Sequence, residues 1–352
     1  MNRLVRCPGV FRLVQPASLL FGLAFLSFNA EGCADDTIPG SRIAATRVLG
    51  ARVETAADPN QTQPAPGEIA QVTWLVTGPR APRPLAWAFQ AWACDDTLDA
   101  DHCAQSETPL NVVGFGSSDG LTAPQLNVTA PDASAVTSKA LTHLLIRGVI
   151  CAGGRVASVD AAPWARCSTS VTDGGARVDE TDVQMTVALR QDAGNRPPSL
   201  TDNPITWGGA SWTSGIGESP TAGGDGECAA APGALIVPID DKDHDIVVAS
   251  DAEDRETYVP AAQDAATIPA AVREALQLSA FATAGSFDSQ FEGIASTETN
   301  PAPSFALKWT PPDTKSDPIP ATGRLVRFIF VLRDLRGGID WSTRTLCLVP
   351  KP

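Results

Sequence analysis

The sequence predicts an all-β chain that folds into two tandem antiparallel β-sandwiches behind an exported N-terminus. Three observations lead to this prediction. Apolar and polar residues alternate along most of the chain, turn-forming residues interrupt the alternation at short intervals, and one proline-rich break divides the chain into two halves. Because alternation places every second side chain on one face of a strand, it indicates sheets with one buried face.

The first 32 residues have the pattern of a secretion signal. Three arginines precede Ala17–Phe28, an uncharged run of 12 residues that is short for a membrane-spanning helix. Small residues then precede Cys33, an arrangement that resembles the lipobox of bacterial lipoproteins. We therefore predict a signal peptide over residues 1–32, a lipid on Cys33 and a tether over residues 33–44. The expected location is the outer membrane or cell surface, with the periplasmic side as an alternative.

The lipobox resemblance is incomplete, so two alternatives stay open. Ala30 and Glu31 occupy positions where lipoboxes carry a branched apolar residue and a small uncharged one. Cleavage after Ala34 would release a soluble secreted protein, and an uncleaved signal would anchor the chain directly.

Charge and composition limit the partners that we expect. Without residues 1–32, the chain keeps 23 basic and 39 acidic residues, a net charge of −16 at neutral pH. This charge argues against binding of nucleic acid or anionic lipid through bulk electrostatics. No cofactor or catalytic motif is convincing, so we expect no cofactor and no enzymatic activity. The expected partners are the membrane, through the N-terminal lipid, and another envelope protein or a glycan.

The first half of the exported chain, residues 45–190, is predicted to form one domain. Four of its segments alternate clearly and are predicted strands: Glu68–Gly78, Leu85–Ala91, Leu141–Cys151 and Val183–Leu189. In the first of these, Val72 and Trp74 share one face while Gln71 lies on the opposite face. This pattern is typical of a half-buried strand.

Residues 191–198 (QDAGNRPP) are the predicted linker, because consecutive prolines cannot donate to a sheet ladder. Residues 199–350 are the predicted second domain. Its predicted strands are Ala234–Ile239, Asp245–Ala249, Glu274–Ala284, Phe305–Trp309, Leu325–Leu332 and Trp341–Val349. One segment conflicts with an all-β chain, since the alanine-rich stretch Ala261–Ala275 predicts a short helix after Pro269.

The last two predicted strands flank Asp334–Gly338, and the glycine pair in this turn allows the positive φ of tight hairpins. A final hairpin with a D-x-R-G-G turn resembles the end of bacterial immunoglobulin-like (Ig-like) and PKD-type domains, over about 25 residues. This resemblance implies that both sandwiches are Ig-like. As a whole, the chain resembles lipoproteins of myxobacteria and similar Gram-negative bacteria that carry such tandem domains. That resemblance assigns no functional residues.

An even number of cysteines in an exported chain predicts disulfides. The six that remain after Cys7 and Cys33 are Cys94, Cys103, Cys151, Cys167, Cys228 and Cys347. Pairing within domains joins the last two to each other. In the first domain, the short-loop pairs Cys94–Cys103 and Cys151–Cys167 are preferred, and Cys94–Cys151 is the alternative. These spacings suit zinc poorly.

Gly116–Gly120 satisfies the G-x-S-x-G pattern, which would make Ser118 a nucleophile. That motif needs a helix after the serine, and the residues that follow start none. Neither His102 nor His143 has a recognisable carboxylate partner in the sequence. We expect a turn at this position.

Two further groups of residues could bind ligands. Asp241, Asp243 and Asp245 alternate and could present oxygens to calcium, but the spacing does not fit an EF-hand and a solvated turn is expected, with no metal. Trp207 and Trp212 flank a glycine-containing loop and could stack on sugar rings.

The leading functional hypothesis is a lipid-anchored, non-enzymatic envelope module that binds another protein or acts as a spacer. Carbohydrate or cell-wall binding through exposed Trp207 and Trp212 is the first alternative, and a secreted hydrolase is the second.

Overall fold

The computed structural model describes the chain from residue 40 to residue 351 with short gaps. The described ranges are 40–79, 83–95, 100–106, 109–110, 113–158, 164–168, 178–190, 194–200, 204–215, 228–231, 233–240, 242–259 and 270–351. The predicted signal peptide and Cys33 lie outside these ranges. Residues 38–352 form one compact unit. No helix within the described ranges is long and apolar enough to cross a membrane.

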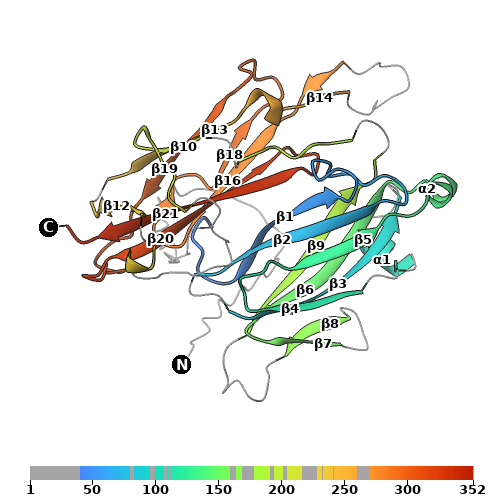
Figure 1. Ribbon diagram of the computed structural model, residues 1–352, viewed down its shortest axis with the longest axis horizontal. Coiled ribbons are helices and arrows are strands. Elements are labelled where there is room, and N and C mark those ends of the chain that lie inside the picture. Colours follow the sequence, from blue (N-terminus) through green and yellow to red (C-terminus); the bar gives the residue numbers. More distant parts are fainter. Residues whose placement is uncertain are drawn as a thin grey trace, which may run out of the picture. The chain divides into compact units, whose positions relative to one another are not determined.

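The first half of this unit is a sandwich of two antiparallel sheets (Figure 1). The smaller sheet has the strand order β1–β2–β5 and the larger has the order β4–β3–β6–β9. Their bounds are β1 (Arg47–Thr55), β2 (Ile69–Thr77), β3 (Leu85–Cys94), β4 (Val113–Ser118), β5 (Gln125–Thr129), β6 (His143–Ala152) and β9 (Asp179–Ala188). Lettered along the chain, strands A-B-E face C′-C-F-G, which is an Ig-like arrangement.

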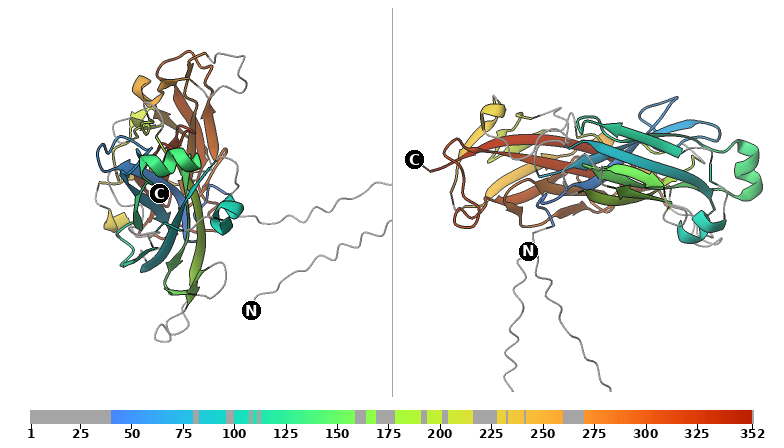
Figure 2. Two further views of the ribbon diagram at one scale, coloured as in Figure 1. Left: turned by 90° about the vertical axis from the view of Figure 1, so that its right-hand side faces the viewer. Right: turned by 90° about the horizontal axis from the view of Figure 1, so that it is seen from below.

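Three short elements lie outside the two sheets. Helices α1 (Ala100–Ser106) and α2 (Ala133–Lys139) lie at one end of the first sandwich (Figure 2), and neither was predicted. The hairpin β7 (Arg155–Ser158) and β8 (Ala165–Ser168) lies at the opposite end, between β6 and β9 in the chain.

The second half is also a sandwich, with sheet orders β11–β10–β13–β19–β17 and β12–β21–β20–β16–β18. The bounds of the first sheet are β10 (Ile205–Trp207), β11 (Ala210–Ser211), β13 (His244–Ala249), β17 (Ser286–Phe287) and β19 (Ser304–Thr310). Those of the second sheet are β12 (Leu235–Pro238), β16 (Leu276–Ala282), β18 (Phe291–Ile294), β20 (Arg324–Arg333) and β21 (Ile339–Val349). Here again A-B-E (β10–β13–β19) faces C′-C-F-G (β18–β16–β20–β21), so the predicted fold class is confirmed.

The predicted helix after Pro269 is wrong in the part that the structure describes. Val272–Arg273 form β15, which pairs antiparallel with β14 (Thr257–Tyr258). Because β15 leads directly into β16, extended backbone is required there, and sheet pairing overrides the helix propensity of the alanines.

Each sandwich has its own apolar core. In the first, Trp74 of β2 stacks on Phe89 of β3 across the two sheets, with ring centroids 3.9 Å apart. In the second, Trp309 of β19 and Phe328 of β20 meet edge to face across the two sheets, with centroids 5.1 Å apart. The alternating apolar residues of both halves therefore point between paired sheets.

A third, smaller apolar cluster joins the two sandwiches. Leu49 and Leu75 of the first sandwich pack in this cluster with side chains of the second, namely Phe281, Ile329 and Val331. Full burial of one such side chain contributes about 1.5–3 kcal/mol. The two sandwiches therefore share a buried interface, which we call the joint.

The segment predicted as a tether takes part in the joint. Ile43 is fully buried in this cluster, and its N–H donates to the carbonyl of Ala282 in β16 at 2.9 Å. The Ala282 N–H donates in turn to the carbonyl of Ser41. The predicted tether over residues 33–44 is therefore too long, since residues 41–43 belong to the folded unit.

The predicted linker also proves to be part of the joint where it is described. Asn195 is fully buried, and its Nδ2 donates to Oγ1 of Thr62 at 3.1 Å and to Oδ2 of Asp334 at 2.8 Å. Thr62 belongs to the first sandwich and Asp334 to the final hairpin of the second. The side chain of Asn195 thus ties both sandwiches to the connecting segment.

Candidate functional site

The three disulfides join Cys94 to Cys103, Cys151 to Cys167 and Cys228 to Cys347, which is the pairing preferred from the sequence. Disulfides of this kind persist in oxidising compartments, so the folded unit belongs to an extracytoplasmic environment.

Both disulfides of the first sandwich hold a cover over the outer face of its larger sheet. Cys94–Cys103 fixes α1 above Trp92 and Leu145. Cys151–Cys167 fixes the β7–β8 hairpin above a second apolar group, formed by Ala86, Ala88 and Val149. Both disulfides have a structural role, because each one ties a short covering segment to the strand beneath it.

Ser118 of the G-x-S-x-G pattern lies at the end of β4, in a turn. Its Oγ donates to the carbonyl of Thr122 at 2.9 Å and accepts from the N–H of Gly120 at 3.2 Å. Gly120 has a φ of +95°, which only glycine adopts easily, and a Cβ there would meet backbone atoms of Arg83. The expected turn is confirmed.

The histidines of the first sandwich are far from Ser118. In the sheet register, Ser118 lies opposite Leu85 and His143 lies opposite Cys94. Nine residues of strand β3 separate these positions, about 30 Å at 3.3 Å per residue. His102 is on α1, which Cys103 attaches to Cys94 at that same distant end. The geometry therefore does not bring a histidine to this serine.

The acidic cluster of the second sandwich is only partly described. Asp240 lies 3.1 Å from Nε2 of His244, and Oδ1 of Asp243 accepts from Oγ1 of Thr310 at 2.7 Å. Asp245, in β13, is paired opposite Lys308 of β19. Asp241 lies outside the described residues, so the expected solvated turn and the calcium alternative both stay predictions from the sequence. Within the described ranges, no group of three or more potential ligands could hold a metal ion.

The two candidate tryptophans are not the exposed pair that the alternative of sugar binding at Trp207 and Trp212 requires. Trp212 is 2% exposed, and its Nε1 donates to the carbonyl of Thr345 at 3.0 Å. Trp207 is half-buried, with its ring centroid 5.1 Å from that of Trp212 and 4.9 Å from that of His244. Both rings extend the core of the second sandwich, because β10 and β11 form a tight hairpin that folds them inward.

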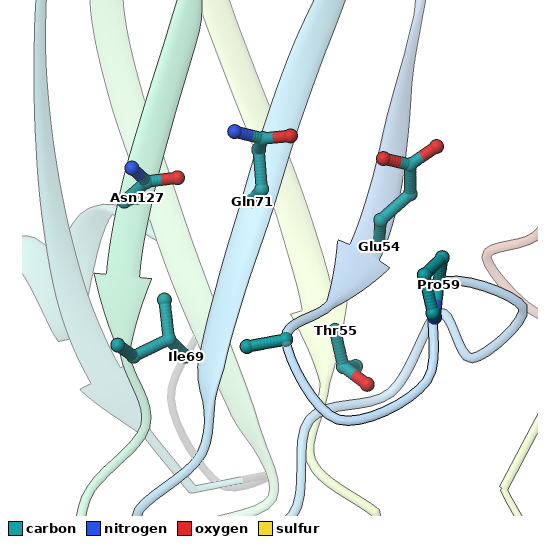
Figure 3. A pocket seen from close by; sticks show the side chains of 7 residues that line it. Glu54, Thr55, Pro59, Ile69, Gln71 and Asn127 are labelled. Atoms are coloured by element: carbon teal, nitrogen blue, oxygen red, sulfur yellow. The ribbon is translucent and has the colours of Figure 1, made fainter.

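The candidate site that the structure does present is a hollow on the outer face of β1–β2–β5 (Figure 3). Its volume is about 320 Å³. Three polar side chains cross the sheet here in one row: Asn127 of β5 is opposite Gln71 of β2, which is opposite Glu54 of β1. Adjacent strands lie about 4.8 Å apart, so the row offers polar groups at a regular spacing.

Below this row in Figure 3, the hollow is lined by less polar groups. Ile69 is 46% exposed, and Pro59 stands on the loop after β1. That loop is held in place, since the N–H of Ala56 donates to the carbonyl of Ile69 and the N–H of Gln61 to that of Asp58, both at 2.9 Å. The hollow thus has a fixed rim.

The polar row is chemically available within the described part of the chain. The side-chain amides of Gln71 and Asn127 make no hydrogen bond there, and each offers two N–H donors and a carbonyl acceptor. The carboxylate of Glu54 has a cationic neighbour, since Nη1 of Arg52 lies 3.8 Å from its Oε1. A row of this kind suits a polar, uncharged ligand with hydroxyl or amide groups.

Two buried carboxyl groups of the second sandwich, Glu274 and Asp334, have raised pKa values. Burial raises the pKa of Glu274 to about 7, although a hydrogen bond from Arg336 at 2.6 Å opposes the shift. Burial likewise raises the pKa of Asp334, against a hydrogen bond from Asn195. The Arg336 guanidinium also lies 4.3 Å from the ring centre of Tyr258. Arg336 also donates to the carbonyl of Gly194 at 3.3 Å, so this cluster of the second sandwich is tied to the connecting segment.

Sequence reasoning missed the hollow for a simple reason. Gln71 was recognised as lying on the polar face of its strand, but only the sheet register shows that Glu54 and Asn127 lie beside it. Alternation predicts the face of a residue and does not predict its neighbour across the sheet.

No protein-family model matches the chain, and no curated protein matches it. The crystal structure of red sea bream transglutaminase aligns over 88% of this chain at 9% identity and a TM-score of 0.23, and this chain spans only 32% of that one. The two tandem V-type regions of a v-region-containing chitin binding protein align over 87% of this chain and 99% of theirs, at 8% identity and a TM-score of 0.22. Scores this low carry no argument about function.

Proposed function

We propose that this chain is a non-enzymatic binding module of the cell envelope, anchored by a lipid on Cys33, with the hollow on β1–β2–β5 as its ligand site. The observation that carries the proposal is the row of Glu54, Gln71 and Asn127. The side-chain amides of Gln71 and Asn127 have no hydrogen-bond partner within the described ranges. The three disulfides support the extracytoplasmic location that such a module needs.

The ligand chemistry that fits this row is a polar, uncharged polymer such as a glycan chain. Amide groups can donate to and accept from hydroxyls, and Ile69 and Pro59 can contact the apolar side of a sugar ring. Glycan binding at Trp207 and Trp212 was the first alternative from the sequence. Because Trp212 is buried, we place the glycan site at the hollow instead.

Binding to purified peptidoglycan and to a glycan array tests the ligand site. The double variant Gln71→Ala/Asn127→Ala should bind about tenfold or more weakly, because each lost hydrogen bond is worth about 1 kcal/mol. Thr186→Ala, an exposed position on the other sheet, is the matched control and should bind as the wild type does. Wild-type-like binding by the double variant would refute the hollow as the site.

The anchor is tested separately in a Gram-negative host. Cys33→Ser should abolish labelling by radioactive palmitate. Treatment of cells that express the wild-type chain with globomycin should leave an uncleaved precursor. Palmitate that still labels Cys33→Ser would contradict the lipid anchor and would leave the ligand site untouched.

A further inference from the structure

Strand β5 has a partner on one side only within the described part of the chain. It pairs with β2, and the connection from β4 to β5, residues 119–124, forms bends and no strand. In the second sandwich, the corresponding strand β19 has β13 on one side and the short β17 on the other. Among the described residues of the first sandwich, no strand pairs with the outer edge of β5.

The ladder of hydrogen bonds shows which backbone groups of β5 face this edge. The N–H of Trp74 donates to the carbonyl of Pro124, and the N–H of Ala130 donates to that of Glu68. Because such bonds alternate in an antiparallel pair, the even-numbered residues of β5 bond to β2. The odd-numbered residues, namely Gln125, Asn127 and Thr129, therefore direct N–H and C=O outward.

Nothing in the strand protects this edge. Proteins commonly blunt an edge strand with lysine, proline or a bulge, whereas β5 has the sequence QLNVT and a regular register with β2. An exposed apolar side chain lies close by in the chain, since Leu121 of the connection is 50% exposed. The short length of β5 limits pairing to a few bonds, which favours one register over extended aggregation.

We propose that β5 pairs antiparallel with β5 of a second copy of this chain, about a two-fold axis at Asn127. In this register the two Asn127 residues face each other, and Gln125 faces Thr129 of the partner subunit. Three outward donors of each strand then meet three outward acceptors of the other, so every outward group of the edge is satisfied. The contact is isologous, which is the commonest symmetry of soluble oligomers.

The side chains around the proposed axis are compatible with self-association. The net charge of −16 repels two copies at long range, but the residues of β5 are uncharged, as are Gln71 and Thr73 beside it on β2. Charges farther than about 8 Å are largely screened at physiological ionic strength. Facing asparagines can also hydrogen-bond across the pair. The association should therefore strengthen as salt is added.

Cysteine cross-linking of the full chain in a Gram-negative host tests the register. Residues facing each other in a hydrogen-bonded antiparallel pair have Cα atoms about 5.5 Å apart, which suits a disulfide. Asn127→Cys should therefore give a reducible dimer under mild oxidation. Thr129→Cys alone should stay monomeric, because its counterpart is about 13 Å away along the strand. Co-expression of Gln125→Cys with Thr129→Cys should restore the cross-link.

The wild-type chain, which also carries Cys33, is the control for dimers that form through that cysteine. A circular dichroism spectrum close to that of the wild type shows that each variant folds. Asn127→Pro adds a test without cysteine, because it removes an outward N–H and no N–H that bonds to β2. It should elute as a monomer in size-exclusion chromatography, under conditions where Asn127→Thr elutes as a dimer. Monomers throughout the cysteine series, or equal cross-linking of Asn127→Cys and Thr129→Cys, overturn the proposal, whatever the result of the glycan assay.

Discussion

In the first sandwich, the outer face of the larger sheet is covered by the chain's own local segments, α1 and the β7–β8 hairpin, each attached by a disulfide. In the second sandwich, the corresponding outer face contributes Phe281, Ile329 and Val331 to the joint. Both sandwiches have the same strand order, so the difference lies in what covers that face. A short local cover buries little surface and is fixed by a covalent bond, whereas a neighbouring sandwich is held by packing.

The disulfide of the second sandwich has a different role from the two in the first. Cys228–Cys347 closes a loop with a sequence separation of 119, against 16 for Cys151–Cys167. It attaches the segment before β12 to the last strand, β21. By the chain-entropy model, closing a longer loop stabilises the fold more.

The largest expected effect is therefore the loss of the long-range disulfide. Replacing Cys228 and Cys347 by serine should lower the free energy of unfolding by up to about 4.7 kcal/mol, the value for a loop of roughly 100 residues. The double serine variant of Cys151 and Cys167 should lose up to about 3 kcal/mol, the value for a loop of roughly 15 residues. Urea denaturation measures both, and the reverse order would contradict the proposed division of roles.

The next effect concerns the joint. Leu75→Ala should lower the free energy of unfolding by about 2–5 kcal/mol, the range for a fully buried leucine, since Leu75 is 1% exposed. It should also speed hydrogen exchange in β20, because Ile329 and Val331 lose their partner across the joint. Exchange measured by mass spectrometry checks this.

A matched control separates the joint from the core beneath it. Leu144→Ala removes a fully buried leucine from the interior of the first sandwich. It should cost a similar free energy and leave exchange in β20 close to that of the wild type. Faster exchange in β20 for both variants would mean that the joint does not act as a separate contact.

The charged cluster around Glu274 gives the second sandwich a pH dependence. Glu274 has a pKa of about 7 when folded and an ordinary value of 4.5 when unfolded, so the folded state binds more protons between these values. Stability from this group is thus fully present below pH 4.5 and is lost as the pH rises through about 7. The loss should reach about 3 kcal/mol, at 1.36 kcal/mol for each pKa unit.

Unfolding in urea at pH 4.5, 6 and 8 measures this slope. Glu274→Gln should remove most of it, because the amide does not titrate. Glu256→Gln is the matched control, since Glu256 also faces Arg336, at 3.7 Å, but is partly exposed. An unchanged slope in Glu274→Gln would assign the pH dependence to other groups, of which buried Asp334 is the first to examine because its pKa is also raised.

Strands such as β2, β6 and β20 could be predicted because each carries its own alternating pattern, whereas β1, β4 and β5 of the first sandwich were not predicted. The short-loop disulfides could be chosen because α1 and β7–β8 are local covers, although the helices themselves have too few residues to show a periodic pattern. The helix predicted after Pro269 failed because β15 pairs with β14 and because Glu274, just after it, is held by Arg336.

The joint and the hollow could not be predicted, because both depend on contacts between distant parts of the chain. In the sequence Ile43 belongs to the predicted tether, and only the structure shows its hydrogen bond to Ala282. Asn195 looks like a linker residue until its bond to Asp334 is known. The hollow needs the register of three strands, and no local pattern in the sequence fixes that register.

The smallest expected effect tests whether Ser118 is more than a turn residue. Ser118→Ala removes two hydrogen bonds in a half-buried turn of the first sandwich and should cost about 1 kcal/mol of unfolding free energy. A fluorophosphonate probe should not label Ser118 in the wild type, because the sheet register keeps the histidines of that sandwich about 30 Å away. Labelling that disappears in Ser118→Ala would show an activated serine. The first sandwich would then be a catalytic domain as well as the one whose outer face carries disulfide-held covers.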